Sequence, residues 1–120
     1  MASILIVDDE DSIRTLLRHI LEEDGHQVRE ATNGHAGLTL YREKPADLVI
    51  TDILMPERDG MEATLALTRE FLDARVIAMT GATGDQNFLN VAKLFGARRV
   101  IQKPFSPADL LRAVRFTLSH

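Results

Sequence analysis

The stretch Ile4-Leu5-Ile6-Val7-Asp8-Asp9-Glu10-Asp11 passes abruptly from wholly aliphatic to wholly acidic. An unbroken apolar run of this length is typical of a strand buried on both faces, because a strand with one wet face alternates apolar and polar residues. Acidic residues directly after the strand favour the start of a helix, whose positive end attracts them. The stretch therefore predicts a buried strand over 4–7 that leads into a helix, with Glu10 and Asp11 as acids of its first turn.

The helical pattern that follows carries apolar and polar residues on opposite faces. Its apolar residues recur at helical spacing, and we expect them to face the core: Ile13, Leu16, Leu17, Ile20 and Leu21. Arg14, Arg18 and Glu22 fall on the other face, where we expect contact with solvent. Gly25 is a helix-ending residue, and it predicts where this helix stops.

The alternation of strand and helix continues to the end of the chain. Further strands are predicted over 26–31, 48–51, 76–79 and 100–102. Helices are predicted from the turn at 32–34 to about 43, from 61 to about 72, from about 85 to 95, and from the cap at 106–109 nearly to 120. This pattern predicts an α/β fold, a doubly wound five-stranded parallel sheet with helices on both faces. The second and fifth strands are the most polar, which favours edge positions and the flavodoxin-like order 2-1-3-4-5.

Composition narrows the class of protein. A chain of 120 residues with 45% hydrophobic content suits one compact domain over 1–120. A net charge of -4 argues against direct nucleic-acid binding, which usually needs a basic face. The absence of cysteine excludes disulfides and thiolate metal sites. Since no apolar run approaches the roughly 20 residues that span a bilayer, and no signal peptide is visible, we expect no membrane insertion and a cytoplasmic location.

Polar residues stand at the ends of four predicted strands. Asp8 and Asp9 follow the first strand, Asp52 the third, Thr80 the fourth and Lys103 the fifth. The carboxyl ends of parallel strands share one edge of the sheet, and ligands bind there, where the strand order reverses. We therefore expect three carboxylates, a hydroxyl and an ammonium group to converge in one crevice.

This combination indicates phosphoryl chemistry assisted by a metal. Two carboxylates at about 4 Å repel by about 1 kcal/mol in bulk water and about 4 kcal/mol at an effective dielectric of 20, so three of them favour a bound cation. Oxygen ligands without Cys or His suit Mg²⁺, which keeps positions open for phosphate. A carboxylate can serve as nucleophile and form an aspartyl phosphate, while Lys103 and Thr80 offer a positive charge and a hydroxyl donor.

Five short motifs now suggest a family. They are Val7-Asp8-Asp9-Glu10, the run Asp47-Leu48-Val49-Ile50-Thr51-Asp52, Met55-Pro56 with Asp59-Gly60, Thr80-Gly81, and Lys103-Pro104-Phe105. In this order and spacing, across essentially the whole chain, they resemble the receiver domains of bacterial response regulators. The resemblance implies a phosphoacceptor switch of a two-component or phosphorelay system, and a signalling domain rather than an enzyme.

The resemblance also implies a metal site. Asp9 would bind Mg²⁺ directly, Asp8 would place the ion through water, and Asp52 with the backbone carbonyl of Leu54 would complete the protein ligands. Asp52 would be the phosphoacceptor.

The resemblance further implies roles for Lys103 and Thr80, a phosphoryl donor, and an output protein that binds a different face. Lys103 would bind the phosphoryl group, the Thr80 hydroxyl would follow it, and the Lys103–Pro104 peptide bond would be cis. The phosphoryl donor would be a phosphohistidine on a sensor histidine kinase or phosphotransfer protein. A downstream output protein would bind the face made by the helix over about 85–95, the strand over 100–102 and the last helix.

Three positions depart from common family residues. Val100 stands where many members carry Tyr or Phe, and its stiff side chain has no ring to swing. We therefore predict that the signal passes through the loop after Thr80. Leu54 and Ala82 cannot orient a water molecule by hydrogen bonding, which predicts slow loss of the phosphoryl group.

Other functions remain open from the residues alone. A phosphohydrolase with an aspartate nucleophile would be expected to carry it after the first strand, and usually a cap domain. A flavin carrier needs a phosphate-binding loop where Asp8-Asp9-Glu10-Asp11 would repel phosphate. A phosphorylation-independent scaffold with the same fold is kept open by Val100.

Overall fold

The parallel sheet has the predicted strand order. The protein is represented by a computed structural model that describes residues 1–53, 59–81, 93 and 95–119. Five parallel strands lie in the order β2-β1-β3-β4-β5. Their bounds are β1 Ser3–Val7, β2 Gln27–Ala31, β3 Leu48–Asp52, β4 Val76–Thr80 and β5 Arg99–Gln102. The two more polar strands, β2 and β5, form the edges, as their composition predicted.

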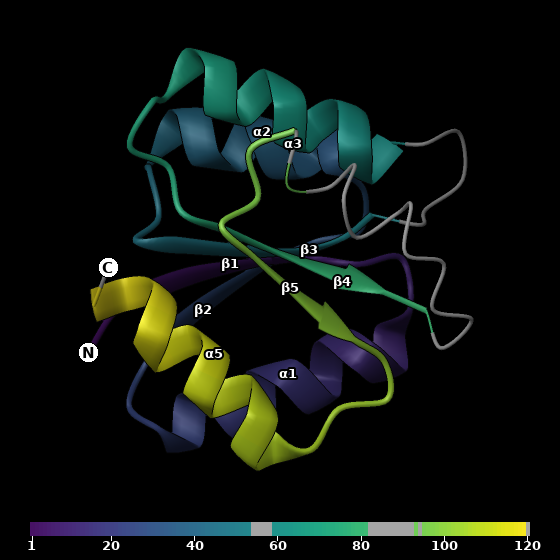
Figure 1. The fold of residues 1–120 in the computed structure, drawn as a ribbon, viewed down its shortest axis with the longest axis vertical. Helices are drawn as coiled ribbons and strands as arrows, with labels where there is room; N and C mark the ends of the chain where they lie inside the picture. Colours follow the sequence, from purple (N-terminus) through teal and green to yellow (C-terminus); the bar gives the residue numbers. More distant parts are fainter. Residues whose placement is uncertain (54–58, 82–92, 94, 120) are drawn as a thin grey trace.

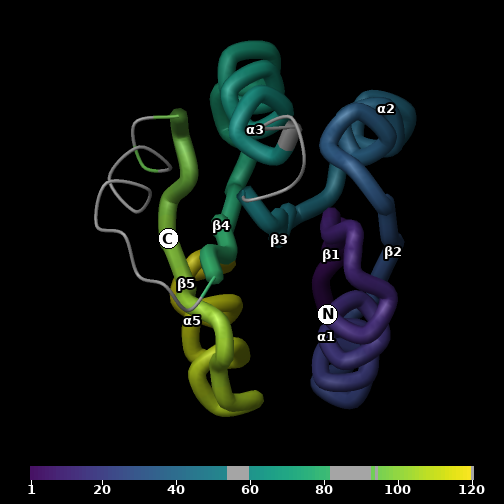
Figure 2. Tube along the Cα trace, turned by 90° about the vertical axis from the view of Figure 1, so that its right-hand side faces the viewer, coloured from purple at the N-terminus to yellow at the C-terminus, as the bar shows by residue number. Residues whose placement is uncertain are grey.

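Helices cover both faces of this sheet (Figures 1 and 2). The described part of the chain contains α1 Asp11–Glu23, α2 Gly34–Glu43, α3 Asp59–Glu70 and α5 Pro107–Ser119. Figure 2 shows α2 and α3 on one side of the strands and α1 and α5 on the other. The helix predicted over about 85–95 lies outside the described residues, apart from 93 and 95.

The central strands are continuously apolar because their two faces bury side chains in two separate cores. In β1, Ile4 and Ile6 pack in the cluster that includes residues of α1 and α5. Leu5 and Val7 point the other way, into the cluster that includes residues of α2 and α3. Successive side chains of a strand alternate between faces, so both sets must be apolar when both faces are covered.

Most helix boundaries follow the predicted signals. Gly25 adopts φ 89 just after α1, a conformation that side chains with a Cβ rarely reach. The Ser106 hydroxyl caps α5 by accepting the Asp109 amide at 3.0 Å. The prediction for α3 was shifted, because this helix begins at Asp59 and ends at Glu70 rather than reaching Leu72. Leu72 is 88% exposed, so its apolar character reflects no contact with the core.

The orientation of α1 was predicted incorrectly at two positions, one on each face. Arg14 was expected in solvent but is buried, whereas Leu16 was expected in the core but is 45% exposed. Arg14 shares the i, i+3, i+7 row with Leu17 and Leu21, both fully buried. The buried face of the helix is therefore centred on this row, which leaves Leu16 exposed.

The two ends of the described chain lie away from the strand ends that carry the acids. In Figure 1, β1 begins and α5 ends at the left, whereas the strand arrows point to the right. The Ala2 amide donates to His26 Nδ1 at 3.1 Å, and the Ser3 amide donates to Asp47 Oδ2 at 2.8 Å. Met1, in contrast, is 93% exposed, so the first ordered anchor of the chain is Ala2.

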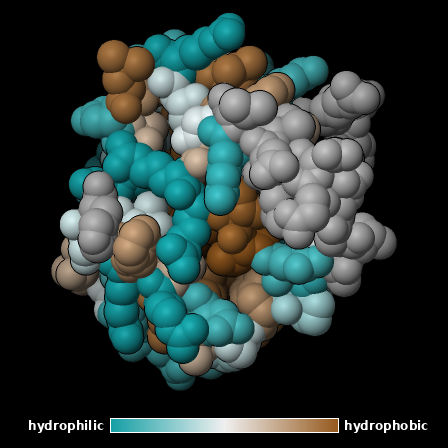
Figure 3. Space-filling model, viewed as in Figure 1, coloured by the Kyte–Doolittle hydropathy of each residue, from teal (hydrophilic) through white to brown (hydrophobic). Residues whose placement is uncertain are grey.

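The surface seen in the same view is mostly hydrophilic, with an apolar patch near its middle over β5 (Figure 3). This agrees with the half-buried side chains of that edge strand. Within the described ranges, no helix combines the length and apolar character needed to cross a membrane.

Candidate functional site

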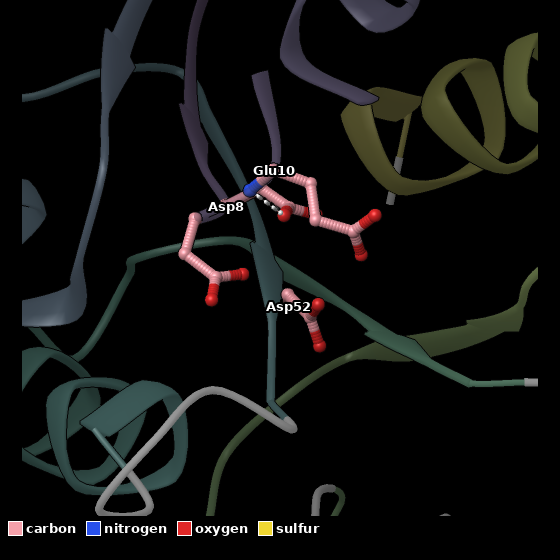
Figure 4. A group of neighbouring side chains, drawn as sticks. Asp8, Glu10 and Asp52 are labelled. Atoms are coloured by element: carbon pink, nitrogen blue, oxygen red, sulfur yellow. Dashed lines mark hydrogen bonds between the residues drawn. The ribbon is translucent and has the colours of Figure 1, made fainter. Parts of the chain in front are cut away.

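The sheet brings the predicted carboxylates together. Val7 pairs with Thr51 across β1 and β3, so Asp8 and Asp52 follow at neighbouring positions along the same edge. Asp8 is fully buried and Asp52 is 5% exposed. Figure 4 shows both side chains together with Glu10, and its dashed line is the bond from the Glu10 amide to Asp8 Oδ1, at 2.8 Å.

Lys103 links the two buried carboxylates. Its Nζ lies 2.9 Å from Asp8 Oδ2 and 2.9 Å from Asp52 Oδ2. The lysine side chain is only 14% exposed, so these contacts form largely out of water. Lys103 comes from the segment after β5, and the ammonium therefore joins three strand ends that are distant in the sequence.

Burial sets the protonation behaviour of this group. Burial raises the pKa of the Asp8 carboxyl above its usual value, and the bonds from the Glu10 amide and Lys103 offset that effect only in part. Burial alone would lower the pKa of Lys103, but the hydrogen bonds to Asp52 and Asp8 outweigh it, and the pKa is raised. Burial therefore disfavours the charged form of Asp8, whereas the two carboxylates favour the charged form of Lys103.

Thr80 stands at the end of β4 with an unsatisfied hydroxyl. Its Oγ1 is buried and has no hydrogen-bond partner among the described residues. Its carbonyl accepts the Lys103 amide at 2.7 Å, which ties the two segments together. A buried hydroxyl without a partner costs about 1–3 kcal/mol, and such a group is a reason to expect a ligand or water.

The acidic cluster is larger than predicted, because it includes Glu10. Asp8, Asp9, Glu10 and Asp52 each offer an oxygen, and these oxygens lie within 4.8 Å of one another. Glu10 was predicted as a first-turn acid of α1, but its side chain makes no capping bond there and lies 3.7 Å from Lys103 Nζ. The sequence signal was present, since Glu10 continues the acidic run after the strand.

These residues fit a hard divalent cation. The four grouped donors are all carboxylate oxygens, and no softer ligand stands among them. Mg²⁺ prefers such ligands and retains water molecules that a phosphoryl oxygen can replace. Asp9 and Glu10 are exposed, whereas Asp8 and Asp52 are buried, so the cluster has an accessible side and an anchored side.

The remaining predictions about the site have different outcomes. Leu54 and Ala82 lie outside the described residues, so the predicted backbone ligand and the predictions about water access stay predictions. The Lys103–Pro104 peptide bond is cis, which confirms that expectation. Val100 is partly buried and packs against the core on the α2 and α3 side.

The fold and these strand-end residues define a class of protein. The chain belongs to the response regulator receiver domain family, and the sequence model of that family matches residues 4–115. It is 39% identical over 116 residues to the chemotaxis protein CheY of Halobacterium salinarum, covering 97% of this chain and 96% of that protein. It is 38% identical over 120 residues to protein PilH of Pseudomonas aeruginosa, covering 99% of both. A receiver domain protein from Clostridium thermocellum superposes with a TM-score of 0.90 at 32% identity, covering 99% of this chain and 95% of that one.

Proposed function

We propose that residues 1–120 act as one receiver domain in which Asp52 accepts a phosphoryl group from a phosphohistidine. The donor would be a sensor histidine kinase or a phosphotransfer protein, and the reaction would take place in the cytoplasm. The observation that carries the proposal is the placement of Lys103 Nζ at 2.9 Å from both Asp8 and Asp52. Family membership supports it, because receiver domains of response regulators interact with such kinases and with downstream effectors.

The residues divide the chemistry between them. An oxygen of the Asp52 carboxylate forms a bond to phosphorus while the bond from phosphorus to the histidine nitrogen breaks, and its electron pair returns to the imidazole. Lys103, already beside Asp52, neutralises the oxygens of the transferred group. The Thr80 hydroxyl donates a hydrogen bond to one of those oxygens and so gains a partner that none of the described residues provides.

Asp8, Asp9 and Asp52 are proposed to hold Mg²⁺, with the Leu54 carbonyl as a further ligand. When bound, the ion would neutralise charge on the acids and the phosphoryl oxygens. The burial of Asp8 supports a fixed ligand on one side, and the exposure of Asp9 supports entry from solvent on the other.

The output is proposed to be a change in partner binding at the face that includes β5 and α5. Lys103 follows β5 directly, and its amide is bonded to Thr80, so a movement of Thr80 is transmitted to this edge of the sheet. Phe116 on α5 is 48% exposed, and the Arg99 guanidinium lies 4.8 Å from its ring centre. These side chains offer an aromatic and a cationic contact to an output protein.

Intact-mass measurement tests the proposal. The parent protein, incubated with acetyl phosphate and Mg²⁺, should gain one phosphate-sized adduct, and Asp52→Ala should gain none. Asp109→Ala is the matched control, because Asp109 is an exposed aspartate on α5, and it should behave like the parent. An adduct of equal yield in Asp52→Ala would exclude Asp52 as the acceptor.

A further inference from the structure

Arg14 of α1 makes an unusual set of contacts for a residue on a helix surface. Its side chain is 11% exposed, and Nη1 donates to the backbone carbonyl of Asp8 at 2.6 Å. Its Nε donates to Glu30 Oε1 of β2 at 3.2 Å, and it also pairs with Asp11. One guanidinium therefore joins α1, β2 and the acidic turn between β1 and α1.

The contact to the carbonyl completes the restraint of Asp8. Each polar atom of Asp8 has a partner. Its amide donates to the Ala31 carbonyl at 3.2 Å, and its carbonyl accepts from Arg14 at 2.6 Å. Its Oδ1 accepts from the Glu10 amide at 2.8 Å, and its Oδ2 accepts from Lys103 at 2.9 Å. The Asp8 carbonyl belongs to the peptide that leads to Asp9. Its direction therefore fixes the direction in which the Asp9 backbone leaves the strand.

Asp9 depends on this restraint more than its neighbours do. Its side chain is exposed, and it makes no hydrogen bond or ion pair in the part of the chain that the structure describes. It nevertheless contributes an oxygen within 4.8 Å of those of Asp8 and Asp52. Its place in the cluster thus comes from its backbone, which Arg14 holds.

We propose that Arg14 is a positioning residue for the cation site, acting through the Asp8–Asp9 peptide. This inference rests on the proposed function, because it assigns a role toward the cation that the acids would hold. Residues that orient metal ligands without contacting the metal typically contribute about 10- to 100-fold to metal affinity.

An effect of Arg14 through its charge and an effect through its position predict opposite changes in cation affinity, so an experiment can distinguish them. Arg14 is a cation near an acidic cluster, so its removal should tighten cation binding if only charge matters. If Arg14 acts by position, its removal should weaken binding. Arg14→Met removes both the charge and the contact, whereas Arg14→Lys keeps the charge but loses the planar guanidinium that reaches three partners.

Mn²⁺ binding, followed by electron paramagnetic resonance, is the readout, with Mn²⁺ standing in for Mg²⁺. We expect Arg14→Met to bind Mn²⁺ roughly tenfold more weakly than the parent and Arg14→Lys to fall between them. The matched control is Arg18→Met, because Arg18 also pairs with Glu30 but does not touch Asp8. All variants are compared below the unfolding transition of the least stable one, as followed by circular dichroism.

A second measurement needs no metal. The Glu10 amide is bonded to Asp8 Oδ1, so its hydrogen exchange should quicken in Arg14→Met relative to Arg18→Met. Equal or tighter Mn²⁺ binding in Arg14→Met, while Asp9→Asn still weakens binding, would overturn the inference and leave the proposed site intact. A parent protein that binds no Mn²⁺ would overturn both.

Discussion

Replacing Lys103 with Met should destabilise the resting protein by an amount that depends on pH and on divalent cations. The ammonium makes two contacts of 2.9 Å with carboxylates, each of which contributes about 6 kcal/mol at an effective dielectric of 20. The cost of burying these charges cancels much of that gain, and removing one partner of a buried ion pair typically costs about 3–5 kcal/mol. Because Lys103 is 14% exposed, we expect a loss of about 3 kcal/mol in the free energy of unfolding at neutral pH.

The pH dependence follows from the acids and not from the lysine. The pKa of Lys103 is raised in the folded protein, so its own contribution is present below 10.5 and is lost only at higher pH. The pKa of Asp8 is raised above 3.8, mainly by burial, and loss of Lys103 raises it further. Between 3.8 and this raised pKa the folded state binds more protons than the unfolded state, so stability falls as pH rises. The deficit of the variant should therefore be larger at neutral pH than at a mildly acidic pH.

Urea denaturation followed by far-ultraviolet circular dichroism measures the effect, with and without millimolar Mg²⁺. Mg²⁺ should reduce the deficit, since it supplies positive charge to the same carboxylates. Arg112→Met removes an exposed cation from α5 and should change stability little, which controls for net charge. A deficit that is the same at both pH values and with Mg²⁺ would refute the electrostatic reasoning.

Three further substitutions test the site and the packing around it. Asp8→Asn keeps an acceptor for the Glu10 amide and removes a buried charge of raised pKa, while Lys103 keeps Asp52 as its charged partner. The free energy of unfolding without Mg²⁺ should therefore rise by about 1 kcal/mol in urea denaturation, and a fall would contradict this account. Thr80→Val should leave stability unchanged or raise it by about 1 kcal/mol, because the hydroxyl has no partner among the described residues. The same substitution should slow adduct formation with acetyl phosphate by about tenfold or more in mass spectrometry, and equal rates would exclude a role of Thr80 in transfer. Gly37→Ala should lower stability by about 1–3 kcal/mol in thermal unfolding, because the new Cβ would lie 2.7 Å from Val7 Cγ2, and Val7→Ala should rescue part of the loss.

The strand order and the central part of the site could be predicted because both follow from local sequence patterns. The alternation of strands and helices predicts a parallel sheet, and the continuous apolar runs at β1, β3 and β4 predict that both of its faces are covered. In a parallel sheet all carboxyl ends share one edge, so polar residues that follow the strands meet without any knowledge of tertiary contacts.

Arg14 and Glu10 could not be assigned in the same way. The helical pattern defines an apolar face, but it does not give the rotation of the helix on the sheet, and that rotation buries Arg14 and exposes Leu16. Glu10 stands at the helix start, where an acid has two plausible uses. The position of the Glu10 side chain depends on Lys103, whose ammonium attracts the carboxylate and which is distant in the sequence.

The placement of the chain ends has a practical consequence for binding measurements. The start of β1 and the end of α5 lie away from the strand ends that carry Asp8 and Asp52 (Figure 1). A reporter dye or a sensor surface attached at either end would therefore leave the acidic edge open to bulk solution. At the amino end the tether should be joined at Met1, because the amides of Ala2 and Ser3 are already engaged in the fold.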